Sequence, residues 1–252
     1  MEAKIYKTLA KILGIVLVVI GVGAFAGGQF AGSFVGSQLK AQRITMPAVE
    51  ELTTTDKGGQ YSQEDVDALA PFAGQLMSSG EMAAAYADHY IAVHLNSAAK
   101  RANVPEDKAT FAGIGDVVKE LEAQLTDEIK ADPTKISTAT LSKLQITAKE
   151  ATSDDNIKSV VSAEEKNPES AYPTAAQISQ LNNLKNNTFF QGNMIRGTLL
   201  SAYGWGLIGK IANIAGIALM VLGVAVLIAG FAVKGNAASH AKASAAHKQR
   251  RD

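Results

Sequence analysis

Two long apolar runs without a charged residue stand near the ends of the chain, at residues 12–36 and 211–233. An α-helix rises about 1.5 Å per residue, so about 20 apolar residues are enough to cross the hydrocarbon core of a bilayer. Soluble helices are rarely apolar on every face over such a length. The pattern therefore predicts two transmembrane helices, at 12–36 and at 207–233.

The first run has a second interpretation, as a secretory signal. Lys4, Lys7 and Lys11 precede it, and the small residues of "AFA" at 24–26 resemble a cleavage site. Cleavage after Ala26 would leave a protein with one C-terminal anchor. The apolar run continues well past Ala26, which favours an uncleaved span.

The region between the two runs has mainly helical periodicity, with apolar residues at intervals of three and four. The predicted helices cover 62–80 with a break near Pro71, 81–102, 116–131, 142–152 and 174–234. A strand is the alternative for 142–152, and the polar segment 152–173 is expected to be loop with one helical turn. The predicted fold class is an all-α membrane protein, in which two transmembrane helices flank a mainly helical extracytoplasmic domain.

The chain is neutral overall, but its charges are unevenly distributed. Residues 37–206 carry a net charge of −7, and the rest of the chain carries +7. Basic flanks of membrane helices stay in the cytoplasm, and here they lie in 1–11 and 234–252. We therefore expect a plasma-membrane protein with a cytoplasmic N-terminus, an extracytoplasmic domain at 37–206 and a basic cytoplasmic tail. Without a cysteine, that domain depends on its own apolar core.

Glycines recur every seven residues in both predicted spans. The first span carries Gly14, Gly21 and Gly28, and Gly32 and Gly36 continue it at four-residue spacing. The second carries Gly209, Gly216, Gly223 and Gly230. In lipid the hydrophobic effect does not pull helices together, so close backbone approach has to do so. We expect these glycines to bind the spans to each other, to a larger membrane subunit, or to both.

The entry into the second span has the composition of a membrane interface. Tyr203 and Trp205, the only tryptophan, match an aromatic belt. Lys210 lies just inside that edge, and we expect its long side chain to extend to the phosphate headgroups.

The segment "YADHYIAVHL" at 86–95 is the main candidate for chemistry, because it holds His89 and His94. At about 100° per residue, an α-helix would direct these two side chains roughly 140° apart. The H-E-x-x-H spacing of zinc-binding helices is absent. A third ligand would have to come from another segment, for example from Asp65, Asp67 or Glu81.

The remaining chemistry of the sequence is sparse. His240 and His247 lie in the predicted cytoplasmic tail, on the other side of the membrane from His89. No G-x-S-x-G nucleophile motif occurs, and "GIG" at 113–115 lacks the lysine and the spacing of a phosphate loop. We therefore interpret 86–95 as a packing face, and predict no catalytic residue, no metal site and no cofactor.

Three stretches together resemble a family: "YADHYIAVHL", "KATFAGIGDVV" and "IRGTLLSAYGWGLIGKIANIAGIALMVLG". They are similar to actinobacterial two-span membrane proteins with an extracytoplasmic helical domain. The residues that carry the resemblance are Tyr86, Ala87, Tyr90, Ala92, Val93, His94, Leu95, Arg196, Gly197, Leu199, Leu200, Ala202, Tyr203 and Gly204. Ile195 stands where the family pattern has leucine.

The resemblance implies a role without chemistry of its own. Some relatives are labelled aromatic ring-opening dioxygenases, a name that the ligand inventory above does not support. Small proteins of similar build are accessory subunits of the actinobacterial cytochrome bcc–oxidase supercomplex. We therefore expect a non-catalytic accessory subunit whose partners are integral membrane subunits and lipid, with no nucleic acid. The alternative is an extracytoplasmic enzyme or sensor that uses the His89–His94 helix.

Overall fold

The computed structural model describes residues 2–232, and within this range the chain is all-α, with no β-strand. The chain divides into two compact units. The first, the hairpin, comprises Met1–Ile44, Leu76–Ala83 and Ser201–Asp252. The second, the helical domain, comprises Thr45–Gln75 and Ala84–Leu200. The hairpin thus takes short segments from both edges of the predicted domain at 37–206, and also Leu76–Ala83 from within it.

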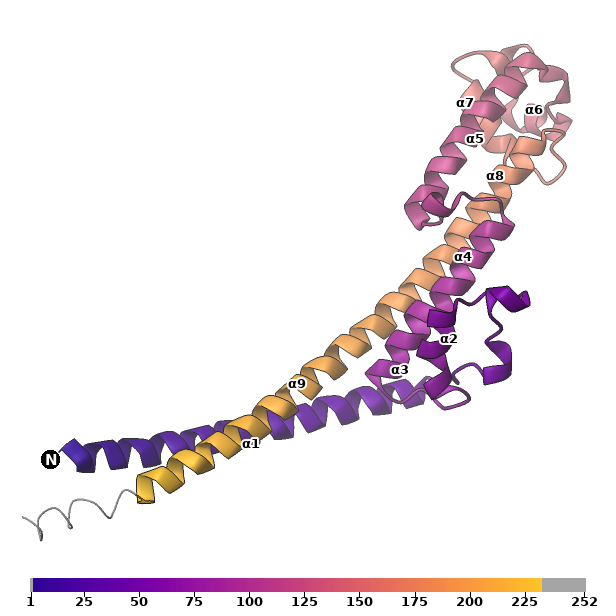
Figure 1. Ribbon diagram of the computed structural model, residues 1–252. Helices are drawn as coiled ribbons and strands as arrows, with labels where there is room; N and C mark the ends of the chain where they lie inside the picture. Colours follow the sequence, from indigo (N-terminus) through magenta and orange to yellow (C-terminus); the bar gives the residue numbers. More distant parts are fainter. Residues whose placement is uncertain (1, 233–252) are drawn as a thin grey trace, which may run out of the picture. The chain divides into compact units, whose positions relative to one another are not determined.

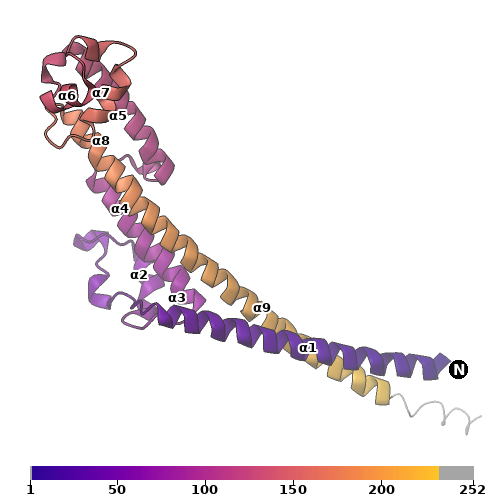
Figure 2. The ribbon, with the colours of Figure 1, turned by 180° about the vertical axis from the view of Figure 1, so that it is seen from behind.

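The hairpin consists mainly of α1 (Glu2–Ala41) and the C-terminal part of α9 (Phe190–Ala232). The two helices run antiparallel, side by side, in both views (Figures 1 and 2). In the most apolar 18-residue stretch of each helix, only 11% (α1) and 17% (α9) of the stretch is buried. The core helix of a soluble protein would be mostly buried, whereas the outward faces of these two helices are apolar enough to suit lipid. The all-α fold with two helices able to cross a membrane agrees with the sequence prediction.

The helical domain is built from helices of one to six turns. They are α2 (Gln63–Leu69), α4 (Ala92–Arg101), α5 (Phe111–Ala131), α6 (Thr138–Leu144), α7 (Ile157–Glu164), α8 (Pro173–Asn183) and the first part of α9. Short 3₁₀ helices at Val49–Glu51, Thr55–Lys57, Ala70–Phe72, Glu106–Lys108, Pro133–Lys135 and Glu150–Thr152 connect them. A further short helix, α3 (Gly80–Ala85), crosses the boundary between the two units.

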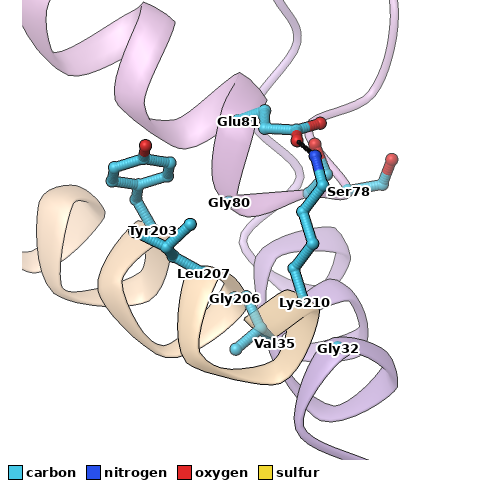
Figure 3. Close-up of a pocket in the computed structure, with 10 residues that line it drawn as sticks. Gly32, Val35, Ser78, Gly80, Glu81, Tyr203, Gly206, Leu207 and Lys210 are labelled. Carbon is cyan, nitrogen blue, oxygen red and sulfur yellow. Dashed lines mark hydrogen bonds and ion pairs between the residues drawn. The ribbon is translucent and has the colours of Figure 1, made fainter. Parts of the chain in front are cut away.

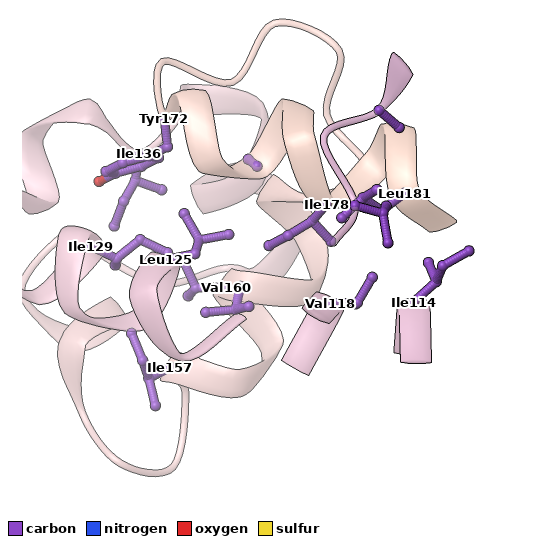
Figure 4. Packing of buried hydrophobic residues seen from close by; sticks show 14 of the residues in the cluster. Ile114, Val118, Leu125, Ile129, Ile136, Ile157, Val160, Tyr172, Ile178 and Leu181 are labelled. Atoms are coloured by element: carbon purple, nitrogen blue, oxygen red, sulfur yellow. The ribbon is translucent and has the colours of Figure 1, made fainter. Parts of the chain in front are cut away.

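The core of the helical domain lies between α5, α7 and α8 (Figure 4). Its most deeply buried side chains are Ile114, Leu125, Ile129, Val160 and Ile178, all 0% exposed. On α5 these residues repeat at helical spacing, so one face of the helix is removed from water. Burying each such side chain is worth about 1.5–3 kcal/mol.

Helix α5 begins five residues before its predicted start at 116. Thr110 caps it, because its hydroxyl accepts a hydrogen bond from the Gly113 N–H at 2.9 Å. Gly113 then sits so close to the backbone of Lys108 that a Cβ would lie 2.6 Å from the Lys108 carbonyl oxygen. The "GIG" sequence is therefore the first turn of a helix.

Two predictions for residues 142–173 are wrong. The helix expected at 142–152 lies earlier, in α6, because Ser137 caps it and Gln145 ends it in the left-handed conformation. The expected loop at 152–173 contains the helix α7. Its buried residues Ile157, Val160, Val161 and Glu164 have helical spacing, but the polar sequence on either side of them obscures this pattern.

Two helices widen into π-helical turns, at Tyr86–Ile91 and at Leu184–Phe189. Each turn is continuous with α-helix on both sides, so Gly80–Arg101 and Pro173–Ala232 each run without interruption. The sequence predicts both long helices but gives no sign of the π turns. The predicted break at Pro71 is present, since α2 ends at Leu69.

Candidate functional site

The glycines of the two apolar helices face each other across the hairpin. Gly14 lies opposite Gly223, Gly21 opposite Gly216, and Gly28 opposite Gly209. Seven residues forward along α1 therefore match seven residues backward along α9. We call these six residues the glycine seam.

The contacts in the glycine seam are reciprocal and very close. A Cβ built on Gly21 would lie 2.7 Å from the Gly216 carbonyl oxygen, and a Cβ on Gly216 would lie 2.7 Å from the Gly21 oxygen. Gly14 and Gly223 give 2.8 Å in both directions. Even alanine would collide with backbone here. The close approach allows dispersion and Cα–H···O contacts between the helices, the forces that remain when lipid removes the hydrophobic drive.

Three of the predicted glycines are not among these six residues: Gly32, Gly36 and Gly230. A Cβ on Gly230 would still contact α1, 3.4 Å from the Ala10 Cβ. A Cβ on Gly32 would meet no atom within 4 Å, and a Cβ on Gly36 would meet the carbonyl oxygen of Ser78. The buried position that continues the seven-residue period in α1 is Val35, at 8% exposure. Along an α-helix, residues spaced four apart shift around the helix relative to a stripe of residues spaced seven apart. This shift explains why Gly32 faces open space.

The two ends of the seam differ in chemistry. Near its start, Lys11 Nζ lies 3.9 Å above the centre of the Phe231 ring, and Lys11 also packs on Gly230. At the other end, Asn213 packs against Gly28, and its buried Oδ1 has no hydrogen-bond donor among the described residues. The close Gly28 backbone offers this oxygen a Cα–H contact.

Beyond Gly28 and Gly209 the helices leave a pocket of about 250 Å³ (Figure 3). Lys210 crosses its rim and pairs with Glu81, with 2.8 Å between Nζ and Oε1. The structure thus gives Lys210 a protein partner, where the sequence suggests only an extension to lipid headgroups. Tyr203 lines the pocket, whereas Trp205 is 61% exposed.

Two serine hydroxyls at the pocket have spare hydrogen-bonding capacity. Ser78 Oγ lies 3.6 Å from the thioether sulfur of Met82, which is a weak acceptor. Ser79 Oγ accepts a hydrogen bond from the Met82 N–H at 3.2 Å, which leaves its own O–H to donate. The pocket therefore combines an apolar floor with an ion pair and two hydroxyls.

The two candidate histidines lie in the helical domain, and both contact the segment Gln60–Asp65. His89 Nδ1 is 2.9 Å from Asp65 Oδ1, and His94 Nε2 is 3.1 Å from the Gln60 side-chain nitrogen. The 140° separation expected from an α-helix does not apply, because His89 lies in the π-helical turn, whose hydrogen bonds join residues five apart.

Both ring nitrogens of His94 have hydrogen-bond partners. Its Nδ1 donates to the Tyr90 carbonyl oxygen at 2.8 Å, so its Nε2 is free to accept from the Gln60 amide. The Tyr90 ring stacks on Tyr86 with 4.6 Å between ring centres. It also contacts the His94 ring, which is tilted by 42° and centred 4.3 Å away. Burial raises the pKa of the neighbouring Tyr61 to about 12, so this phenol stays protonated at neutral pH.

Asp65 is occupied by structural hydrogen bonds. Its Oδ2 accepts from the Ser62 backbone N–H at 2.9 Å and from the Ser62 hydroxyl at 2.6 Å, which caps α2, while Oδ1 contacts His89. Burial opposes ionisation, but the Ser62 and His89 hydrogen bonds outweigh it and lower the pKa of Asp65. Within residues 2–232, no three His, Asp or Glu side chains gather at a point that could hold a metal ion.

Residues of two of the three stretches that carry the sequence resemblance contact each other in the helical domain. Arg196 Nε donates to the Ala87 carbonyl oxygen at 3.0 Å, and its guanidinium contacts Asp88 at 2.9 Å. The Leu95 side chain fills the space above Gly192, where a Cβ would lie 2.7 Å from Leu95 Cδ2. These contacts therefore join α4 and the π-helical turn at Tyr86–Ile91 to α9, a role that sequence alone does not reveal.

Several predicted features lie outside the described residues: His240, His247 and the basic tail at 234–252. No family model matches the chain, and no curated protein or solved structure does either. The geometry and chemistry of residues 2–232 are therefore what bears on function.

Proposed function

We propose that the protein is a non-catalytic accessory subunit of a membrane protein complex, with both termini in the cytoplasm and the helical domain outside. The observation that carries the proposal is a second face of α1 that the hairpin leaves open. Gly27 has no neighbour within 4 Å of a Cβ, and Phe30 and Phe34 stack on each other at 70% and 54% exposure. A small residue beside exposed aromatic rings suits the close approach of another membrane helix.

The glycine seam supports this proposal, but not by contacting a larger membrane subunit, which is one of the roles expected from the sequence. Its glycines are used within the chain, so they do not by themselves indicate a partner. They make a rigid two-helix unit, and a rigid unit loses less conformational freedom when it binds. The contacts on both sides of Ala26, at Gly21 and Gly28, also favour an uncleaved first helix.

The sequence resemblance suggests the respiratory bcc–oxidase supercomplex as the complex. Affinity purification of tagged chain after mild detergent extraction tests this. We expect b- and c-type haem absorption in the purified fraction, lost with Gly27→Leu and retained with Val224→Leu, which changes an exposed residue of α9. Haem-free fractions that contain no other integral membrane protein would contradict the proposal.

Cysteine labelling tests the orientation, because the chain has no cysteine of its own. Ser153→Cys lies in the helical domain and Tyr6→Cys near the start of α1, where Tyr6 is 70% exposed. We expect a membrane-impermeant reagent to label the first and not the second in intact cells. The reverse pattern would contradict the orientation.

An enzyme or sensor at the histidine helix remains the second candidate. The observation in its favour is the π-helical turn, a feature often found at functional sites, beside two histidines that both contact Gln60–Asp65. About one transition metal per purified chain, lost with His89→Ala or His94→Ala, would favour it. We expect no stoichiometric metal, since hydrogen bonds to Ser62 already occupy one Asp65 oxygen.

A further inference from the structure

We propose that the pocket between α1, α3 and α9 binds the headgroup of a zwitterionic phospholipid. The phosphate would lie against Lys210 and the hydroxyls of Ser78 and Ser79, and the headgroup ammonium against Glu81. The pocket belongs to the hairpin alone, so the proposal does not depend on the accessory role.

The pocket lies at the height of a membrane surface. Lys210 follows Gly209, which faces Gly28, and Lys7 and Lys11 lie 21 and 17 residues before Gly28 on α1. At about 1.5 Å per residue these separations are about 31 and 26 Å, which bracket the roughly 30 Å hydrocarbon core. With these two lysines near one surface, Lys210 and its pocket lie near the phosphates of the other. Residues 211–232 contain no charge, so Lys210 is the last charged group before the hydrocarbon.

The polar groups at the rim match both charges of such a headgroup. The ammonium of Lys210 has three N–H donors, of which one goes to Glu81 Oε1. The other two, with the hydroxyls of Ser78 and Ser79, can donate to phosphate oxygens. Glu81 Oε2 is left to accept from an ammonium.

The ion pair is better explained by recognition than by stability. Lys210 and Glu81 are 65% and 58% exposed, and exposed pairs contribute only about 0–1 kcal/mol to folding. One positive and one negative group make the rim neutral. An anionic headgroup would satisfy Lys210 but would leave Glu81 facing a like charge, which selects a zwitterion.

Three glycines create the hollow: Gly32, Gly80 and Gly206 all line it. Its volume of about 250 Å³ lies below the roughly 300–1,000 Å³ of sites for drug-sized ligands, so it suits a headgroup and not a whole lipid. Val35 and Leu207 form an apolar side along which the first acyl carbons can lie.

Gly32 offers a direct test, because it lines the pocket and a side chain there meets no protein atom within 4 Å of its Cβ. Gly32→Leu should fill the hollow without disturbing the glycine seam. Gly23→Leu is the matched control, since Gly23 is equally open and does not line the pocket.

The experiment measures lipid binding to the full-length chain in dodecyl maltoside by native mass spectrometry. The probes are palmitoyl-oleoyl phosphatidylethanolamine, the corresponding phosphatidylglycerol, and inorganic phosphate. We expect one tightly bound phosphatidylethanolamine, bound about tenfold more weakly by Lys210→Gln or Glu81→Gln, because each loses a charge-assisted hydrogen bond. Gly32→Leu should abolish binding, and Gly23→Leu should retain it.

The remaining outcomes each decide the proposal. Phosphatidylglycerol should bind about tenfold more weakly than phosphatidylethanolamine, and Glu81→Gln should narrow this difference. Equal binding of the two lipids to wild type would overturn the role of Glu81 and with it the zwitterion. Displacement of the lipid by inorganic phosphate alone would assign the pocket to a soluble ligand. Wild-type binding by Gly32→Leu would show that lipid binds elsewhere.

Discussion

In the hairpin, α1 and α9 meet backbone to backbone through residues without side chains, whereas in the helical domain α5 and α8 meet through large buried side chains. Gly21 and Gly216 approach until a Cβ would lie 2.7 Å from the opposite carbonyl oxygen. Leu125 and Ile178 instead fill the space between their helices and are 0% exposed.

The difference fits a helical domain in water and a hairpin whose two helices are able to cross a membrane. Water drives large apolar side chains together, because their burial removes apolar surface from it. Lipid gives no such drive, and helices associate there through close packing at small residues. The comparison therefore makes opposite predictions: added atoms should disrupt the hairpin, and removed atoms should disrupt the helical domain.

The largest expected effect is the loss of hairpin pairing by Gly21→Leu. The first added carbon already collides with the Gly216 carbonyl oxygen, and backbone cannot move aside as a flexible side chain can. The free-energy cost to helix pairing should therefore exceed the roughly 1–3 kcal/mol that is typical of overpacked cores. A cysteine pair at Ala10 and Gly230 reports pairing, because a Cβ on Gly230 lies 3.4 Å from the Ala10 Cβ.

We expect oxidation to cross-link the Ala10→Cys/Gly230→Cys chain, and Gly21→Leu to abolish the cross-link on non-reducing gels. Gly23→Leu adds the same atoms to an open face of the same helix and should leave it intact. If both leucine variants cross-link equally, the glycine seam does not hold the hairpin together.

The next effect is a cavity in the helical domain. Leu125→Ala removes a fully buried side chain of α5 and should lower the free energy of unfolding by about 2–5 kcal/mol. Val49→Ala, at a residue 57% exposed, should change it by less than about 0.5 kcal/mol. Denaturant unfolding followed by circular dichroism measures both. If Leu125→Ala and Val49→Ala lowered the free energy of unfolding equally, Leu125 would not lie in a closely packed core.

The same contrast shows how far the sequence predicts the molecule. The sequence shows directly the two long uncharged apolar runs and the glycines that recur every seven residues. The two long apolar helices and most of the glycine seam could therefore be predicted. Val35 continues the seam with a large residue, and no glycine pattern could identify it. Gly32 is also a glycine of the first span, but it does not lie on the face of α1 that contacts α9 through the glycine seam.

Contacts between distant residues could not be predicted at all. Lys210 and Glu81 pair across 129 residues of sequence, as Arg196 and Asp88 do across 108, and no local pattern connects either pair. The π-helical turn at Tyr86–Ile91 has no propensity signal either, so the α-helical angle between the histidines was the wrong geometry. Helix α7 could have been found, since its buried residues have helical spacing.

A smaller effect is expected at Glu164, which is 0% exposed and the only fully buried carboxylate among the residues whose burial the structure describes. It accepts from the Ser137 N–H at 3.1 Å and the Ser170 hydroxyl at 2.5 Å. Burial opposes ionisation, but the hydrogen bonds from Ser170, Thr140 and Ser137 outweigh it and lower the pKa below its ordinary value of 4.5.

Because the folded pKa is lowered, ionised Glu164 stabilises the domain fully above the unfolded pKa. This stabilisation is lost as pH falls from about 4.5 through the folded pKa. Glu164→Gln keeps the shape but replaces one of the two accepting oxygens by an NH₂ that faces a donor, and it removes the charge. It should cost about 1–3 kcal/mol at pH 7. Unfolding at pH 7 and pH 3 should show a difference between the two proteins that shrinks at low pH. A constant difference would contradict the assigned charge.

The smallest effect concerns Arg196, whose side chain contacts the π-helical turn at Tyr86–Ile91. Arg196→Gln removes the hydrogen bond to the Ala87 carbonyl and the contact with Asp88, and should cost the helical domain about 1 kcal/mol. Asp88→Asn keeps the first contact and weakens only the second, at a side chain 44% exposed, so it should cost less than about 0.5 kcal/mol.

The informative result is that Arg196→Gln should destabilise the helical domain more than Asp88→Asn does. The Ala87 carbonyl oxygen also accepts from the Ala92 N–H within the π-helical turn, so the Arg196 side chain supports this turn from outside the helix. Loss of Arg196 should therefore loosen the turn itself, which hydrogen exchange at Ala92 would detect as reduced protection, whereas Asp88→Asn should leave this protection unchanged. If Asp88→Asn destabilises as much as Arg196→Gln, the ion pair and not the backbone contact joins the two helices. A large effect of Arg196→Gln on haem copurification with unchanged stability would instead place Arg196 at a partner interface.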